Sequence, residues 1–181
     1  MIELFLKVWL YLRVKWSNIR YKKNVNNYNI EDDFIISKLD INKLKEIQKK
    51  LYNRFTYSYD GIDELFDCMR KPAQCYLDSC KNNWEDDCDG FHAALYHIYY
   101  KNGYDPYLLT MILPEKIFES HTICVIKNKN QWYYCDYTSV KIFNTLEDCI
   151  EYFKKAKEVN NIFWNLVKFN YQENKYEIKS Y

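Results

Sequence analysis

Hydrophobic positions recur with the period of an α-helix over the first twenty residues of the chain, and basic side chains occupy the other faces. Two interpretations of this amphipathic helix stay open. It docks on the rest of the domain, or it contacts a membrane surface or a partner protein, for which Trp, Lys and Arg are well suited. The pattern consists of Ile2, Phe5, Leu6, Trp9, Leu10, Arg13 and Trp16 on one side, with Lys7, Lys15 and Arg20 elsewhere.

Helical spacing continues in four later segments, and capping residues mark where several of them begin and end. Asp40 is placed to cap one helix, and Thr145 with Asp148 resembles a capping box for another. Gly103 stands where a helix C-terminus is expected. The predicted helices cover residues 41–51, 62–69, 87–102 and 145–156, and a polar loop is expected over residues 24–29.

The pattern changes to that of β-strands after Gly103. Three strands are expected over Tyr107–Leu113, His121–Lys127 and Trp132–Tyr137, and the polar run Asn128–Asn130 predicts a tight turn between the last two. Strand and irregular structure are expected over residues 162–178. Because helices come first and consecutive antiparallel strands follow, the predicted class is α+β.

Composition narrows the picture further. A chain of 181 residues with 48% hydrophobic residues is long and apolar enough for one domain with a sizeable core. Its 26 basic and 25 acidic residues give a net charge of +1, so no electrostatic argument favours a nucleic-acid partner.

Seven cysteines, an odd number, stand in a chain whose N-terminal segment lacks the features of a secretory signal. A cytoplasmic, reducing location is therefore expected, where cysteines are free, metal-bound or catalytic. Structural zinc held by Cys68, Cys75, Cys80 and Cys88 is one alternative, although their spacing lacks the close pairs of common zinc sites.

Cys88 is the strongest candidate for chemistry. It lies in the first turn of the predicted helix 87–102, where unpaired backbone N–H groups favour a negative charge and lower a thiol pKa. The adjacent acids, Asp87 and Asp89 among them, act in the opposite direction. A nucleophilic cysteine needs a base and a group that orients the base. His121 begins one strand and Asp136 lies near the end of the next, so a hairpin, whose register the sequence does not fix, can place them side by side.

These residues belong to three ordered blocks that resemble the transglutaminase-like superfamily of papain-fold cysteine enzymes. The resemblance covers residues 71–143, and neither the first 55 residues nor the C-terminal tail belongs to it. The blocks are Lys71-Pro72-Ala73-Gln74 followed by Asp87-Cys88-Asp89-Gly90-Phe91, then His121-Thr122-Ile123-Cys124-Val125, then Trp132-Tyr133-Tyr134-Cys135-Asp136-Tyr137-Thr138.

The resemblance implies a Cys-His-Asp triad that acts through a thioester acyl-enzyme. Cys88 is then the nucleophile, His121 the general base and acid, and Asp136 the residue that orients His121. The oxyanion would be held by the Cys88 backbone N–H and by one of three candidate side chains, Gln74, Asn82 or Trp84. No cofactor and no metal are implied, and the expected substrate is a peptide or protein amide.

The implied architecture has a catalytic cysteine at the start of a central helix packed on an antiparallel sheet. Residues 1–55 are expected as an N-terminal helical extension and residues 56–181 as the catalytic domain, in one compact unit. Two departures from the family pattern are Asp86, where glycine is common, and His92, where alanine is common. His92 is expected on the helix surface. The alternatives are a true transglutaminase or deamidase, and an inactive binding module.

Overall fold

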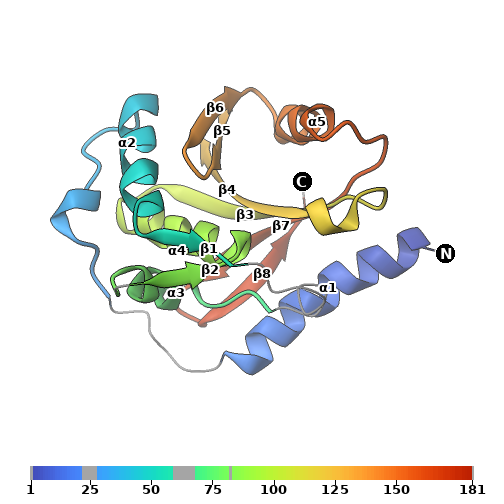
Figure 1. The fold of residues 1–181 in the computed structure, drawn as a ribbon, viewed down its shortest axis with the longest axis horizontal. Coiled ribbons are helices and arrows are strands. Elements are labelled where there is room, and N and C mark those ends of the chain that lie inside the picture. The colour runs from blue at the N-terminus through green and yellow to red at the C-terminus, as the bar shows by residue number, and fades with distance from the viewer. Residues whose placement is uncertain (1, 22–27, 59–67, 82, 181) are drawn as a thin grey trace.

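The computed structural model describes residues 2–21, 28–58, 68–81 and 83–180. Its helices lie mainly in the first half of the chain and its antiparallel strands in the second, which confirms the α+β class (Figure 1). The helices are α1 (Ile2–Arg20), α2 (Ile41–Tyr52), α3 (Pro72–Ser79), α4 (Cys88–Lys101) and α5 (Leu146–Ala156), with short 3-10 helices η1 (Asp32–Phe34) and η3 (Ile117–Glu119).

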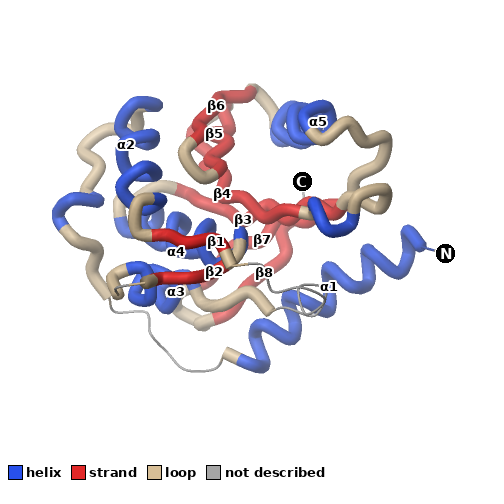
Figure 2. Tube along the Cα trace, in the orientation of Figure 1, coloured by secondary structure: helices blue, strands red, loops and turns tan. Residues whose placement is uncertain are grey.

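Six strands form an antiparallel sheet in the order β6-β5-β4-β3-β7-β8, drawn in red in Figure 2. Consecutive hairpins build β3 to β6, and β7 then returns to pair with β3. A separate pair of short strands, β1 and β2, runs parallel. The strands are β1 (Phe55–Tyr57), β2 (Trp84–Asp86), β3 (Asp105–Ile112), β4 (His121–Asn128), β5 (Gln131–Asp136), β6 (Ser139–Phe143), β7 (Phe163–Asn170) and β8 (Lys175–Lys179).

The central helix α4 is buried over eleven of its fourteen residues, as expected for a helix that is apolar on nearly every side. It packs on one face of the sheet, where Leu108 and Cys124 join its core, while Leu109 and Ile123 point to the other face and contact the cluster that includes α5. This alternation follows from the two-residue period of a strand. The sheet is therefore covered on both faces, and α4 is held rigidly against it.

Helix α1 lies along the β7–β8 side of the molecule (Figure 1). Its inner positions Leu6, Leu10 and Val14 are buried, which confirms the docked interpretation. Its outer face leaves apolar side chains such as Leu4 and Ile19 exposed, so a membrane or partner contact there stays a prediction. None of the described helices combines the length and the hydrophobicity needed to cross a bilayer.

The first 55 residues share the core of the rest of the chain. Phe34, Leu44 and Ile47, which are fully buried, belong to the same cluster as Phe91 of α4. Residue 55 therefore does not separate two hydrophobic cores, and the extension is an integral part of the compact unit.

The capping signals of the sequence are confirmed. The Asp40 side chain accepts hydrogen bonds from two backbone N–H groups of α2, and Thr145 with Asp148 forms a reciprocal capping box on α5. Gly103 has a φ of 78° just beyond α4, a conformation that glycine adopts without strain. The predicted turn is the two-residue connection between β4 and β5.

The sequence pattern missed α3, β6 and the β1–β2 pair. Helix α3 is only eight residues long and has Pro72 at its first position, where a proline fits a helix without losing a hydrogen bond. Strands of three to five residues are too short for a clear alternation. The helix expected over residues 62–69 and the loop expected over residues 24–29 fall largely outside the described residues.

Candidate active site

Cys88 occupies the first position of α4, and the residue before it caps the helix. The Asp87 carboxylate accepts hydrogen bonds from the backbone N–H groups of Asp89 (3.0 Å) and Gly90 (3.1 Å). Because the first turn of a helix has no carbonyl partners for its N–H groups, this cap stabilises the turn. It also fixes the direction in which the Cys88 side chain leaves the helix.

A second acid holds the other side of this turn. The Asp86 carboxylate accepts hydrogen bonds from the Asp87 N–H (3.1 Å) and the Trp84 indole (3.2 Å), and it forms an ion pair with Arg70. A Cβ atom at position 90 would collide with this carboxylate. Glycine at position 90 therefore lets the Asp86 carboxylate approach the start of α4 in this chain.

His121 and Asp136 meet as the sequence predicts. His121 is the first residue of β4 and Asp136 is the last of β5, and the His121 Nε2 atom lies 2.8 Å from Asp136 Oδ1. Burial alone would raise the pKa of Asp136, but hydrogen-bond and charge interactions, above all with His121, outweigh burial and hold that pKa well below its usual range. An ionised carboxylate only accepts hydrogen bonds, so His121 Nε2 carries the proton and Nδ1 is left as the basic nitrogen.

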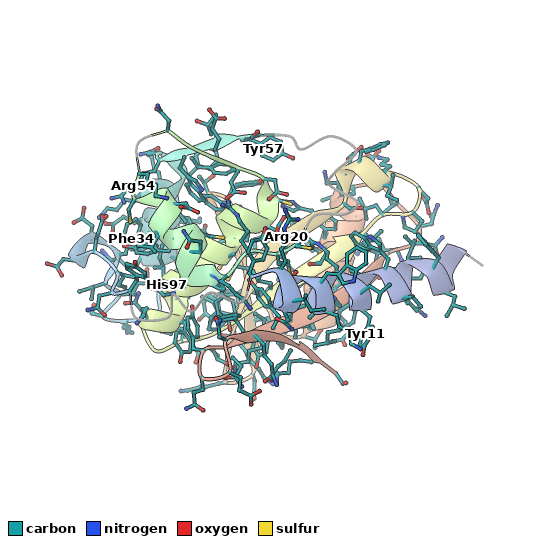
Figure 3. The ribbon with its side chains drawn as sticks, turned by 90° about the horizontal axis from the view of Figure 1, so that it is seen from below. Tyr11, Arg20, Phe34, Arg54, Tyr57 and His97 are labelled. Carbon is teal, nitrogen blue, oxygen red and sulfur yellow. The ribbon has the colours of Figure 1, made fainter. Side chains whose placement is uncertain are left out.

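Cys88 and His121 line one cavity of about 200 Å³. The thiol lies against the backbone N–H of Thr122, the residue next to His121. Helix α1 supplies part of the wall of this cavity, including Trp9 and Arg13, and Figure 3 shows α1 crossing this side of the molecule. The structure thus brings the predicted nucleophile, base and orienting acid to one place.

The surroundings of the thiol reverse one expectation. Burial raises the pKa of Cys88 well above its ordinary value, and the Asp87 and Asp89 carboxylates raise it further, while the Thr122 N–H and Arg13 act in the opposite direction. The helix start therefore does not by itself produce a thiolate. At neutral pH the thiol is protonated, and a base has to remove its proton for Cys88 to act as a nucleophile.

Arg13 shows how α1 takes part in the site. Its guanidinium lies 3.2 Å from the Asp89 carboxylate, and both side chains are buried. Burial alone would raise the pKa of Asp89, but the charge of Arg13, together with hydrogen bonds and the charge of Arg70, outweighs burial and lowers that pKa. Arg13 also lies 3.5 Å from the Thr110 hydroxyl, which in turn is 3.0 Å from the Thr122 hydroxyl. Asp89 is therefore one half of a buried ion pair.

His92 is completely buried rather than on the helix surface. Its Nδ1 atom lies 2.6 Å from the Cys88 carbonyl oxygen, and its Nε2 atom accepts a hydrogen bond from the Tyr137 N–H at 3.3 Å. A carbonyl only accepts, so Nδ1 carries the proton, and burial lowers the pKa of His92, which keeps the ring neutral. His92 therefore joins the start of α4 to the turn that follows Asp136.

This contact also supports an unusual backbone conformation. Tyr137 has a φ of 44°, which is uncommon for a bulky residue, and its ring packs against His92, Phe91 and Phe55. Such conformations persist where the surrounding structure fixes them, and they are concentrated at functional sites. The i, i+4 spacing of Cys88 and His92 was the sequence signal for this arrangement.

The structure describes two of the three oxyanion candidates. Gln74 donates to Asp78 at 3.2 Å on α3, and the Trp84 indole N–H is engaged by Asp86. Neither side chain lines the cavity of Cys88. Asn82 lies outside the described residues. The Cys88 backbone N–H, at the first position of α4, is the donor that the helix geometry itself provides.

Two groups of side chains within the described residues have the spacing of metal ligands. One is His92, His121 and Asp136, and the other is Asp87, Cys88 and Asp89. In the first group the His92 Nε2 lone pair already accepts the Tyr137 N–H, so metal binding would require that hydrogen bond to break. All seven cysteines are free thiols, and neither group is the four-cysteine zinc site considered from the sequence.

Comparison of the chain with protein-family models, with curated proteins and with solved structures found no match. The resemblance to the transglutaminase-like superfamily therefore rests on the sequence blocks alone, and the site has to be interpreted from its own geometry.

Proposed function

We propose that this chain is a cysteine-dependent acyl-transfer enzyme, a peptidase or amidase with a transglutaminase-like, papain-like architecture. The observation that carries the proposal is the His121–Asp136 hydrogen bond of 2.8 Å beside a cysteine at the start of a buried helix, in a shared cavity. A nucleophile, a base and a group that orients the base are the elements that covalent acyl transfer requires.

The proposed reaction has two steps. His121 Nδ1 takes the proton of the Cys88 thiol as the sulfur attacks the carbonyl carbon of an amide or ester. The tetrahedral intermediate collapses when the leaving amine or alcohol takes that proton, and a thioester remains on Cys88. Water then attacks the thioester, His121 accepts a proton from the water, and the acid is released as the thiol regains its proton.

Asp136 and the backbone supply the remaining parts. Asp136 holds His121 in the tautomer with the proton on Nε2 and stabilises the imidazolium that forms during each transfer. The Cys88 N–H is proposed to donate to the oxyanion. Because the thiol pKa is raised at rest, the proton is transferred during the attack, and no preformed thiolate–imidazolium pair is needed.

The direct test uses an activated ester, p-nitrophenyl acetate, with acid quenching and intact-mass analysis. The proposal predicts a single acetyl group, located on Cys88 by peptide mapping, and a matching burst of p-nitrophenol. Cys80 is the other cysteine that is not buried, so the assay is run in a Cys80→Ala background. Equal acetylation in Cys88→Ala would contradict the proposal.

The same assay separates the alternatives. Added primary amine that captures the acyl group faster than water does would indicate a true transglutaminase. An inactive binding module predicts no acyl-enzyme with any ester. Metal analysis of the purified protein addresses the His92, His121 and Asp136 group, because one equivalent of bound zinc would engage the base and contradict the proposed role of His121.

A further inference from the structure

The cavity beside Cys88 has an apolar wall, and the part of it that α1 supplies lies outside the segment that the sequence resemblance covers. Helix α1 contributes Leu6 and Trp9, strand β3 contributes Ile112, and η3 contributes Ile117 and Phe118. Leu6 and Ile112 are buried, while Phe118 is 64% exposed. The cavity therefore combines this apolar wall, which includes an accessible ring, with polar lining side chains such as Thr110 and Ser120 and with Cys88 and His121.

The charged groups that reach the cavity already have partners. Arg13 pairs with Asp89 at 3.2 Å, and the Asp87 carboxylate accepts two backbone N–H groups at the start of α4. An anionic substrate group that entered the cavity would lose its hydration and meet the Asp87 and Asp89 carboxylates, while the one guanidinium among the described lining residues is already paired with Asp89, which is costly. A cationic group would lose its hydration beside carboxylates that already have ion-pair or hydrogen-bond partners. An apolar group would gain about 25 cal/mol for each Å² of apolar surface removed from water.

The size of the cavity sets an approximate size for the group. An engineered protein cavity of about 150 Å³ binds benzene, and this cavity measures about 200 Å³. Its volume thus suits an uncharged group of the size of one aromatic ring or a branched aliphatic side chain. We propose that this cavity, walled by α1, is the acyl-binding subsite, and that it selects uncharged apolar acyl groups of about that size.

This inference rests on the proposed function, because the cavity is a subsite only if Cys88 is acylated. The test compares p-nitrophenyl esters of acetate, phenylacetate, 4-carboxyphenylacetate and 4-(aminomethyl)phenylacetate. The last three share one ring and differ in charge. Each rate of Cys88 acylation is divided by the rate of the same ester with glutathione, which removes differences in intrinsic reactivity.

The subsite predicts that phenylacetate acylates Cys88 at least tenfold faster than acetate, and at least tenfold faster than either charged analogue. Trp9→Ala removes part of the wall and should lower the ratio of the phenylacetate rate to the acetate rate. Leu12→Ala, on the same helix but outside the cavity, is the matched control and should preserve the preference.

Phe118→Lys provides a variant that does not disturb the core, because the side chain is exposed. The added ammonium should raise the 4-carboxyphenylacetate rate at least threefold relative to phenylacetate. Ile35→Lys changes an exposed position whose side chain does not line the cavity, and it should leave the ratio of these two rates unchanged.

The outcomes separate the two claims. Acylation of Cys88 at equal normalised rates for all esters, or a preference that neither Trp9→Ala nor Phe118→Lys changes, overturns the subsite and leaves the proposed enzyme intact. Absence of acylation by every ester overturns the proposed function and the subsite with it.

Discussion

The Asp136 carboxylate has one histidine from the sheet and another from the central helix beside it, and the two rings differ in surroundings. His121 lies 2.8 Å from Oδ1 and its side chain keeps 14% of its surface exposed at the cavity. His92 lies 3.5 Å from the same oxygen and is fully buried. Both nitrogens of His92 have backbone partners, whereas only Nε2 of His121 is engaged by Asp136.

The difference shows that proximity to a carboxylate does not define a catalytic base. A base needs a nitrogen that is basic, reachable by the reacting group and not already used as an acceptor. In the proposed reaction His121 is the histidine with a nitrogen left for the reacting group, whereas both nitrogens of His92 already have partners. His92 is a positioning residue, which holds the start of α4 against the turn that carries Tyr137.

The strongest test of this comparison is His121→Ala. General base catalysis contributes about 10²–10⁴-fold to rate, so acylation of Cys88 should fall by a factor in that range. His121 is only partly buried, so the midpoint of urea unfolding should shift little. Stopped-flow release of p-nitrophenol measures the first effect and circular dichroism the second. An unchanged acylation rate would assign the base to another group.

The reverse result is expected for His92→Phe. The ring volume is kept, but the Cys88 carbonyl and the Tyr137 N–H lose their partner, and each unsatisfied buried group costs about 1–3 kcal/mol. The free energy of unfolding should therefore fall by about 2–6 kcal/mol, and kcat should fall through loss of positioning.

His92→Gln separates positioning from proton transfer, because glutamine both donates and accepts but does not titrate. It should recover part of the stability and of kcat, and the pH profile of acylation should keep its wild-type form. A profile that loses its dependence on pH in His92→Gln would make His92 the base and invert the comparison.

Asp136→Asn is expected to have a smaller effect on rate than loss of the base. Asparagine keeps a hydrogen bond to His121 but presents an amide that can select the wrong tautomer. We expect kcat to fall more than tenfold with little change in KM, and Asp136→Ala to be at least as severe. Glu85→Gln, which changes an exposed carboxylate in β2, is the control. A silent Asp136→Asn would show that His121 is oriented by something else.

Asp89 cannot serve as that control, although the sequence alone presents it as a simple helix-start acid. It is the buried partner of Arg13, and removal of one member of a buried pair leaves the other charge uncompensated. Asp89→Asn would therefore change stability as well as the electrostatics beside Cys88.

His97, the third histidine of the chain, extends the comparison to the dependence of stability on pH. His97 lies on α4, and its partners are the Tyr171 hydroxyl and the Tyr28 carbonyl. Figure 3 labels His97 toward the left and Tyr11 of α1 toward the right. Burial lowers the pKa of His97 from 6.5 to about 4. The unfolded chain takes up this proton first, so stability is fully present above pH 6.5 and is lost as pH falls through 4.

That pKa shift corresponds to a loss of about 3 kcal/mol in the free energy of unfolding as the pH falls from 6.5 to 4. His97→Gln does not titrate, so its free energy of unfolding should fall less than that of the wild type between pH 6.5 and pH 4, as measured by urea titration at each pH. Identical slopes for the two proteins would mean that His97 is not held neutral by the fold.

The features of the fold and of the candidate site that could be predicted from the sequence are those that depend on residues close together in the chain. Asp40, Thr145 and Gly103 act through backbone groups a few residues away, so their roles in caps and turns could be predicted from the sequence. The sequence indicated that a hairpin could place His121 beside Asp136, but the register that joins them comes from the two-residue turn of the folded hairpin. The position of Cys88 at the start of a helix could be predicted because Asp87 and Gly90 lie on either side of it in the sequence.

The missed features depend on contacts between distant segments. Nothing near Arg13 in the sequence reveals that it pairs with Asp89, 76 positions away. The burial of His92 depends on Tyr137 and the sheet, and the raised thiol pKa depends on how completely α1, α4 and β4 enclose Cys88. The apolar cavity is likewise made by α1, β3 and η3, which meet only in the folded chain.

The central claim is that His121 activates Cys88, and the most direct measurement is the rate of Cys88 alkylation by iodoacetamide from pH 5 to 10. It is followed by peptide mapping in Cys80→Ala and in Cys80→Ala/His121→Ala. The account predicts that Cys88 is modified first and the buried Cys124 and Cys135 are spared. It also predicts that loss of His121 lowers the rate near neutral pH at least tenfold and leaves only the alkaline rise of a thiol with a raised pKa. Superimposable profiles for the two proteins would contradict it.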